Sequence, residues 1–285
     1  MGKPAALLRL MCPVNCVMMG FAVIVGAALA TKSISIIERE WQSSLYGFIT
    51  GFMLTAASMA INDYYDRQID EVNEPNRPIP SGAVKPKEAL TFASALTVIG
   101  LIAAFLTSYF CFITAVAAWI VFVAYTTVGK RSGLPGNFLV SICVAIPLVY
   151  GSIVATYAVQ LNVSFFALVA FLSNTGREIT KGIVDVKGDQ SRHVKTLAVR
   201  YGEKLASAAA AAFYLIAVLL SPVPLFLRLV SLWFIPLVAI ADLGLVTSSI
   251  LLLRDYSREN ARKIKNMVLI WLAVGLLAFV AGAVG

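Results

Sequence analysis

Repeated apolar stretches of membrane-spanning length constrain this chain more than any other feature of its sequence. A helix needs about 20 residues to cross about 30 Å of hydrocarbon. Because 59% of the 285 residues are hydrophobic and 13% are charged, the chain is too apolar for an ordinary soluble domain. We therefore expect one all-α, polytopic membrane domain over residues 1–285, with about nine transmembrane helices. The apolar windows lie near residues 13–31, 44–62, 89–107, 110–128, 137–157, 162–180, 203–221, 226–253 and 266–284.

Basic residues gather on alternate connections between these windows. If the N-terminus is cytoplasmic, 20 of the 23 Lys and Arg residues lie on the cytoplasmic side, and only Lys32, Arg39 and Arg228 lie outside. This positive-inside bias predicts a multi-pass protein of the cell membrane with a cytoplasmic N-terminus. Topology and attraction to anionic headgroups also explain the net charge of +8, so we expect no nucleic-acid partner.

Several smaller motifs have structural explanations. The four cysteines lack CxxC spacing, so neither a disulfide framework nor a zinc site is expected. Gly47 and Gly51 form a GxxxG pair, which favours close helix packing. His193, the only histidine, is expected to lie in a loop. Asp242 lies near the middle of the eighth window, where a carboxylate requires either a structural hydrogen bond or a role toward a second substrate.

The stretch INDYYDRQIDEVNEPNRPIPSG, residues 61–82, places several carboxylates at the end of the second apolar window. Asn62, Asp66 and Asp70 are spaced by four residues, so they share one face if the helix continues through them. Asp63 lies beside that face. Carboxylates this close repel one another unless cations compensate them.

A second acidic pair, Asp185 and Asp189, follows the sixth window on the same expected side of the membrane. Hard oxygen ligands from Asp and Asn suit Mg²⁺, which commonly bridges one or two carboxylates to substrate phosphates. Two acidic clusters among basic residues therefore predict a site for a metal ion and a diphosphate. The accompanying cations are Arg67, Arg77, Lys130, Arg131, Lys181, Lys187 and Arg192.

These segments resemble the two signature loops of the UbiA superfamily of intramembrane prenyltransferases. The matching segments are NDYYDRQID followed by NRPIPSG, and DVKGD followed by KTLAVRYG. The resemblance covers nearly the whole chain. It implies nine transmembrane helices around a central cavity that opens to the cytoplasmic side and laterally to lipid.

The resemblance also implies roles for individual residues. The Mg²⁺ ligands it implies are Asn62, Asp63, Asp66, Asp70, Asp185 and Asp189. The residues implied to contact the diphosphate of a prenyl donor are Asn62, Arg67, Arg77 and Lys130. The implied catalytic residues are Asp66, Asp70, Asp185 and Asp189, together with Tyr125, which would line the cavity near the reacting allylic carbon. Cys12 departs from the family pattern because many relatives carry arginine there, which removes one expected diphosphate contact.

Within the superfamily, the second motif is most similar to that of archaeal enzymes of ether-lipid synthesis. Those enzymes transfer a geranylgeranyl group from geranylgeranyl diphosphate to the free hydroxyl of geranylgeranylglyceryl phosphate. The expected partners are therefore a prenyl diphosphate, a lipid-like acceptor and membrane lipid, with Mg²⁺ as cofactor. Chlorophyll synthases and aromatic prenyltransferases of quinone pathways remain alternatives. An ion-coupled transporter is an alternative from a different class of protein. Its acidic residues would line a site near the middle of the membrane, whereas the acids here end helices on one side.

The charge distribution gives a test of topology. Single cysteines placed at Gly82 and Arg192 should react with an impermeant thiol reagent from the cytoplasmic side, and one at Asn162 from the opposite side. Labelling of positions 82 and 192 on different sides of the membrane would contradict a shared site for the two acidic clusters.

Overall fold

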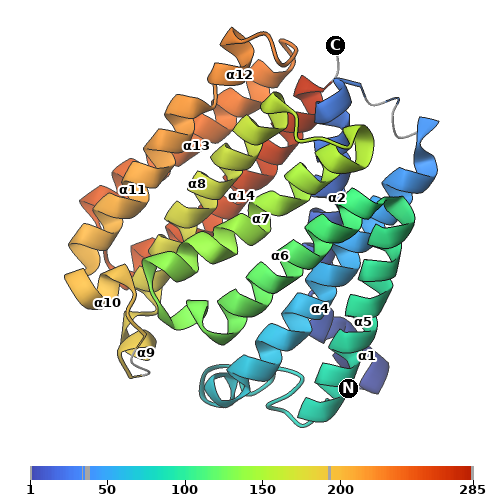
Figure 1. Cartoon of the computed structure of the whole chain (residues 1–285). Helices are drawn as coiled ribbons and strands as arrows, with labels where there is room; N and C mark the ends of the chain where they lie inside the picture. Colours follow the sequence, from blue (N-terminus) through green and yellow to red (C-terminus); the bar gives the residue numbers. More distant parts are fainter. Residues whose placement is uncertain (1, 34, 36–38, 192–193, 284–285) are drawn as a thin grey trace.

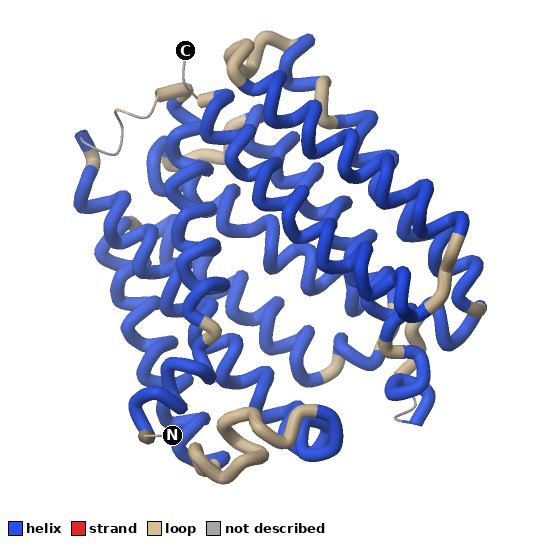
Figure 2. Tube along the Cα trace, turned by 180° about the vertical axis from the view of Figure 1, so that it is seen from behind, coloured by secondary structure: helices blue, strands red, loops and turns tan. Residues whose placement is uncertain are grey.

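The computed structural model describes residues 2–283 except 34, 36–38 and 192–193. Helices form most of this part, and no strand occurs within it (Figure 2). A helix satisfies its backbone hydrogen bonds internally, as a hydrocarbon environment requires. The long helices are α2 (Pro13–Thr31), α4 (Trp41–Asn73), α5 (Pro86–Thr107), α6 (Tyr109–Thr127), α7 (Leu134–Thr156), α8 (Leu161–Val184), α11 (Glu203–Leu220), α13 (Phe234–Arg254) and α14 (Arg258–Gly282). The short ones are α1 (Lys3–Met11), η1 (Gly129–Arg131), α9 (Val186–Ser191), α10 (Leu197–Tyr201) and α12 (Val223–Phe226).

Eight of the helices in the described ranges are long and apolar enough to cross a membrane. The prediction of a polytopic, all-α membrane protein is therefore confirmed. Helix α8 is also long, with 24 residues, but Arg177, Glu178 and Lys181 make its C-terminal part polar. The count of nine spans stays a prediction.

Two sequence-based boundaries can be compared directly with the helices. The second window continues as one helix, because α4 extends for 33 residues through both Asn62 and Asp70. The eighth window, 226–253, starts too early, since α13 begins only at Phe234. Between α12 and α13, Arg228 has a φ angle of 54°. This left-handed backbone does not continue a right-handed helix.

The helices form two groups around a shared centre (Figure 1). Helix α2 packs against α4 and α7, and α7 packs against α8. Helices α4, α5 and α6 lie on one side of this centre, and α11, α13 and α14 lie on the other. The connection from α4 to α5, the η1 turn and α9 gather at the same end of the bundle (Figure 1). Both acidic clusters belong to this end, which we call the site end.

Glycine allows the central helices α2 and α7 to approach closely. A Cβ atom on Gly26 would collide with the backbone of Leu148, and one on Gly151 would collide with the backbone of Val23. Gly47 and Gly51 of α4 also face side chains or backbone of α2 at 3.0 to 3.2 Å from an added Cβ. The predicted packing role of the GxxxG pair is confirmed.

The structure changes the choice of the outer labelling position. Asn162 is buried, and its side-chain amide donates to the carbonyl oxygen of Leu29. Val159 lies in the same connection between α7 and α8 and is 49% exposed. A cysteine at Val159 is therefore the better reporter for this side.

The contact between α2 and α7 gives a stability prediction. Gly151→Ala should lower the free energy of unfolding in detergent by about 1–3 kcal/mol, because backbone must move to accept the methyl group. The matched control is Gly275→Ala in α14, where nothing lies within 4 Å of an added Cβ. Thermal unfolding followed by intrinsic fluorescence measures both. Equal melting temperatures for the two variants would show that close packing of α2 against α7 at Gly151 does not limit the stability of the folded protein.

Candidate active site

The end of α4 carries the first acidic cluster. Asp66 and Asp70 are only 8% and 6% exposed, although they lie at the site end of the bundle. Their four-residue spacing with Asn62 keeps the three side chains on one helix face, as the sequence predicts. Buried carboxylates require compensating charge or hydrogen bonds, and two cations from other segments provide both.

Lys130 reaches the first of these carboxylates from the η1 turn. Its Nζ forms a short ion pair with Asp66 Oδ2 and donates to Asn62 Oδ1 at 3.1 Å. The amide of Asn62 in turn donates to Asp66 Oδ2 at 3.0 Å. Asn62, Asp66 and Lys130 thus form one polar group, although 64 residues separate the lysine from the aspartate.

Arg77 joins the remaining acids of α4. Its Nη1 lies 3.0 Å from Asp63 Oδ1 and 2.9 Å from Asp70 Oδ2. Burial raises the pKa of Asp70, while the positive charge of Arg77 acts in the opposite direction. Cys12 lies within electrostatic range of Asp63 and Arg77, so the position where many relatives carry arginine does border this cluster.

Backbone geometry holds the Lys130 turn in place. The amide of Lys195 donates to the carbonyl oxygen of Arg131 at 3.3 Å, which joins the η1 turn to the segment after α9. Gly133 has a φ angle of 77°, and a side chain there would collide with the backbone of Lys195. Glycine is therefore required at this crossing for both conformation and space. The crossing brings the loops of the two acidic clusters together.

The second cluster lies at the C-terminus of α8. Asp185 is exposed and caps α8, with its amide donating to the carbonyl oxygen of Lys181. Asp189 is half-buried in α9, and its amide donates to the carbonyl oxygen of Asp185 at 2.9 Å. Tyr125 of α6 lies within electrostatic range of both Asp66 and Lys181. It is therefore near both the first cluster and the charged side chains of α8.

Sequence reasoning named Lys181 but missed its two charged neighbours on α8, Arg177 and Glu178. Glu178 pairs with Arg177 at 3.0 Å and with Lys181 at 3.6 Å. The Nε atom of Arg177 is buried without a hydrogen-bond partner. The signal was present, because three charges within five residues interrupt an otherwise apolar window. The predicted span 162–180 passes through Arg177 and Glu178 and ends just before Lys181.

Other predicted site residues lie elsewhere. The guanidinium of Arg67 donates to the carbonyl oxygen of Tyr64 at 2.7 Å and stacks on its ring. Arg67 also lines a separate polar pocket with Glu71, so the structure does not place it with the acids above. Asp242 accepts a hydrogen bond from Ser221, the residue that follows α11, which favours its structural role. Arg192 and His193 lie outside the described residues.

The donor set can be tested against the expected metal. Within the described ranges, no three His, Cys, Asp or Glu side chains are grouped as a ready metal site. Lys130 and Arg77 instead hold the α4 carboxylates. Mg²⁺ needs only one or two carboxylates when substrate phosphates and water complete its shell. The carboxylate and amide oxygens of this face therefore fit Mg²⁺ bound together with a diphosphate.

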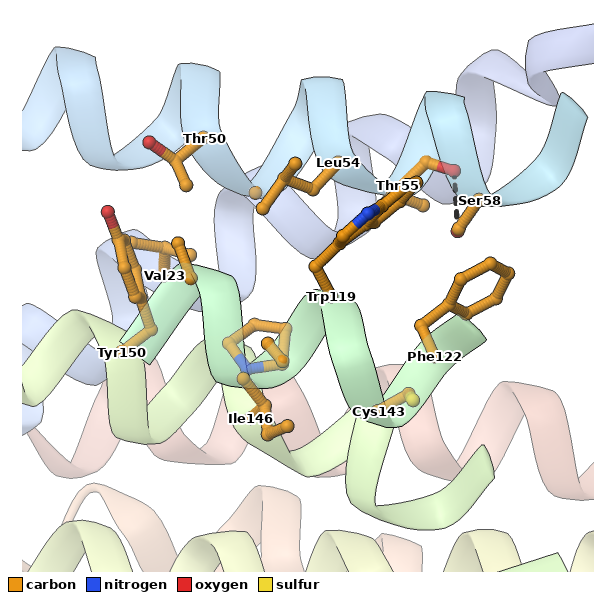
Figure 3. A pocket seen from close by; sticks show the side chains of 14 residues that line it. Val23, Thr50, Leu54, Thr55, Ser58, Trp119, Phe122, Cys143, Ile146 and Tyr150 are labelled. Carbon is orange, nitrogen blue, oxygen red and sulfur yellow. Dashed lines mark hydrogen bonds between the residues drawn. The ribbon is translucent and has the colours of Figure 1, made fainter. Parts of the chain in front are cut away.

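An apolar pocket continues from this polar face into the bundle. Figure 3 shows Ser58 and Phe122 at one end and Thr50 and Tyr150 at the other. Ser58 is one helical turn from Asn62 on α4, so the cavity begins next to the acids. Its lining residues come from α2, α4, α6 and α7: Val23, Thr50, Gly51, Leu54, Thr55, Ser58, Ala115, Ala118, Trp119, Phe122, Cys143, Ile146, Pro147 and Tyr150.

Known proteins share both this fold and this sequence. Residues 18–282 match the UbiA prenyltransferase family. A digeranylgeranylglyceryl phosphate synthase from Archaeoglobus fulgidus is 37% identical over 270 residues, which are 93% of this chain and 91% of that protein. A solved structure of a digeranylgeranylglyceryl phosphate synthase is 31% identical, with a TM-score of 0.82 over 100% of this chain and 99% of that chain. A UbiA homologue from Archaeoglobus fulgidus, bound to GPP and Mg²⁺, shares the fold at 16% identity and a TM-score of 0.63, over 96% of this chain and 99% of that chain.

The Asp66–Lys130 pair yields a prediction. Asp66→Asn should abolish nearly all turnover of a prenyl diphosphate, because the amide keeps the shape but loses the negative charge that a metal requires. Lys130→Ala should lower the rate roughly 10- to 150-fold, since one charged hydrogen bond is worth about 1.5–3 kcal/mol. Steady-state kinetics at saturating Mg²⁺ measure both, and Glu259→Gln, an exposed charge on α14, is the control. A Lys130→Ala enzyme with wild-type kinetics would place that lysine outside the diphosphate site.

Proposed function

We propose a reaction for this chain from one premise: it belongs to the UbiA prenyltransferase family and is a membrane-embedded prenyltransferase. The proposed donor is geranylgeranyl diphosphate, and the proposed acceptor is the free hydroxyl of geranylgeranylglyceryl phosphate. The product is the second ether bond of an archaeal lipid. The observation that carries this choice is 37% identity, over 93% of the chain, to a synthase named for this product.

The donor's diphosphate is proposed to bind between the two acidic clusters. Mg²⁺, when bound, would neutralise charge on the departing diphosphate. Lys130 and Arg77 would exchange part of their present contacts with carboxylates for contacts with phosphate oxygens. The residues proposed to hold the metal are Asn62, Asp63, Asp66, Asp70, Asp185 and Asp189. Arg67 is not included, because it is turned toward Tyr64.

The proposed reaction breaks the allylic carbon–oxygen bond of the donor. The acceptor hydroxyl oxygen forms a new bond to that carbon, its proton is released, and diphosphate leaves. Fixed positive charges from Lys130 and Arg77 stabilise the leaving group as it becomes more negative. Tyr125 is proposed to lie near the carbon at which the allylic cation would develop. The protein therefore acts mainly by positioning and electrostatics.

The apolar cavity is the proposed seat of the donor's prenyl chain. It starts beside Asn62 and is lined mostly by apolar side chains, which suits a hydrocarbon that must be kept next to a charged head. Together with the distribution of basic residues, this arrangement supports a site facing the cytoplasm in the cell membrane. Both substrates carry long chains, so a membrane enzyme can receive them from lipid.

A panel assay tests the proposal. Purified protein with Mg²⁺ and geranylgeranyl diphosphate is offered geranylgeranylglyceryl phosphate, chlorophyllide, 4-hydroxybenzoate and a naphthoate, and products are identified by mass spectrometry. We expect digeranylgeranylglyceryl phosphate as the main product. Removal of Mg²⁺ with EDTA should stop the reaction, and added Mg²⁺ should restore it.

Other results would replace this proposal. A product only with chlorophyllide or with an aromatic acceptor would assign another acceptor within the same family. Ion flux without any prenyl product would support the transporter class. Full activity in EDTA would show that the reaction does not require a metal ion.

A further inference from the structure

The apolar pocket has one end remote from the acids, and the residues at this end can be identified. Tyr150 of α7 lies opposite the site end of the cavity and is only 3% exposed (Figure 3). Its hydroxyl has no hydrogen bond of normal geometry, although Thr50 and Cys111 lie near it. The ring is itself part of a buried cluster that includes Ala104 and Ile153. Tyr150 therefore lies at the boundary between the pocket and a buried part of the bundle.

The length of the cavity follows from the helix that forms one of its walls. Thr50 and Ser58 of α4 line its two ends, and Asn62 lies one turn beyond Ser58. At about 1.5 Å per residue, Thr50 is roughly 18 Å from Asn62 along the helix. A geranylgeranyl group has sixteen carbons in its main chain. With carbon–carbon bonds of about 1.5 Å, each advancing the extended chain roughly 1.25 Å, it spans about 19 Å.

We propose that Tyr150 sets the maximum length of the prenyl group that this enzyme transfers. The inference rests on the proposed function and adds a specificity-determining residue to it. A chain anchored by its diphosphate at Asn62 and Asp66 would reach the Tyr150 ring with its last isoprene unit. A longer donor that extends in this direction would have to displace the ring, because the ring is buried among the side chains of this cluster. Hydrophobic pockets discriminate single methylene groups by about 10- to 200-fold, so a whole isoprene unit should be sensed.

Two kinds of substitution test this role: some enlarge the pocket at Tyr150, and one narrows it. Tyr150→Ala opens space toward Ala104 and Cys111, which are fully buried, and should admit a donor longer by one isoprene unit. Tyr150→Leu does the same to a smaller extent and keeps apolar packing. Tyr150→Phe keeps the ring and is the matched control. Ala118→Phe fills the middle of the cavity from α6 and should favour a shorter donor.

The experiment is a competition with geranylgeranylglyceryl phosphate as the fixed acceptor. Equal amounts of the 15-, 20- and 25-carbon prenyl diphosphates are supplied with Mg²⁺, and products are separated by mass. In Tyr150→Ala or Tyr150→Leu, the ratio of 25- to 20-carbon product should rise about tenfold or more. It should stay unchanged in Tyr150→Phe, and Ala118→Phe should raise the ratio of 15- to 20-carbon product.

Failure of this inference can be told apart from failure of the proposed function. No product from the wild-type protein with any of the three donors would refute the proposed function. Normal wild-type turnover, with unchanged product ratios in a folded Tyr150→Leu variant, would refute only the role of Tyr150. If Tyr150→Ala does not fold, Tyr150→Leu decides. An unchanged ratio in Ala118→Phe would show that the tail lies outside this cavity.

Discussion

Charge compensation at the end of α4 is the interaction on which the rest of the site depends. Four polar side chains, three of them carboxylic acids that repel one another, share or border one helix face beside apolar helices. Lys130 and Arg77 compensate them from two different connections. Each contact therefore does two things. It stabilises the acids, and it joins a connection between two helices to the end of α4.

The same contacts couple the two helix groups. The η1 turn that presents Lys130 also accepts a backbone hydrogen bond from Lys195, which follows the second acidic pair. Gly133 permits this crossing because its conformation and its lack of a side chain are both needed there. The segments next to the first and second clusters are thus joined at the site end, although they are far apart in sequence. A ligand that bridges them would hold the two groups of helices together.

The polar face and the apolar cavity also form a continuous row on α4. Leu54, Ser58, Asn62 and Asp66 follow one another at four-residue intervals, so one helix carries both the wall of the cavity and the acids. This row explains how one helix could hold both the charged diphosphate and the hydrocarbon chain of a prenyl donor. Helical periodicity alone makes such a row, because side chains four residues apart lie one above the other.

The sequence by itself determined the membrane helices, the side of the membrane that its basic residues favour, the shared face of Asn62, Asp66 and Asp70, and the family. All of these depend on local composition, on short-range periodicity or on contiguous motifs. Only the tertiary structure decided that Lys130 meets Asp66, that Arg67 turns toward Tyr64, that Glu178 joins Arg177 and Lys181, and that Tyr150 lies at one end of the apolar pocket. The physical reason is that a side chain's partners depend on which helices pack against its own and on which rotamer that packing leaves open. That information is spread over residues distant in the chain, and no local pattern contains it.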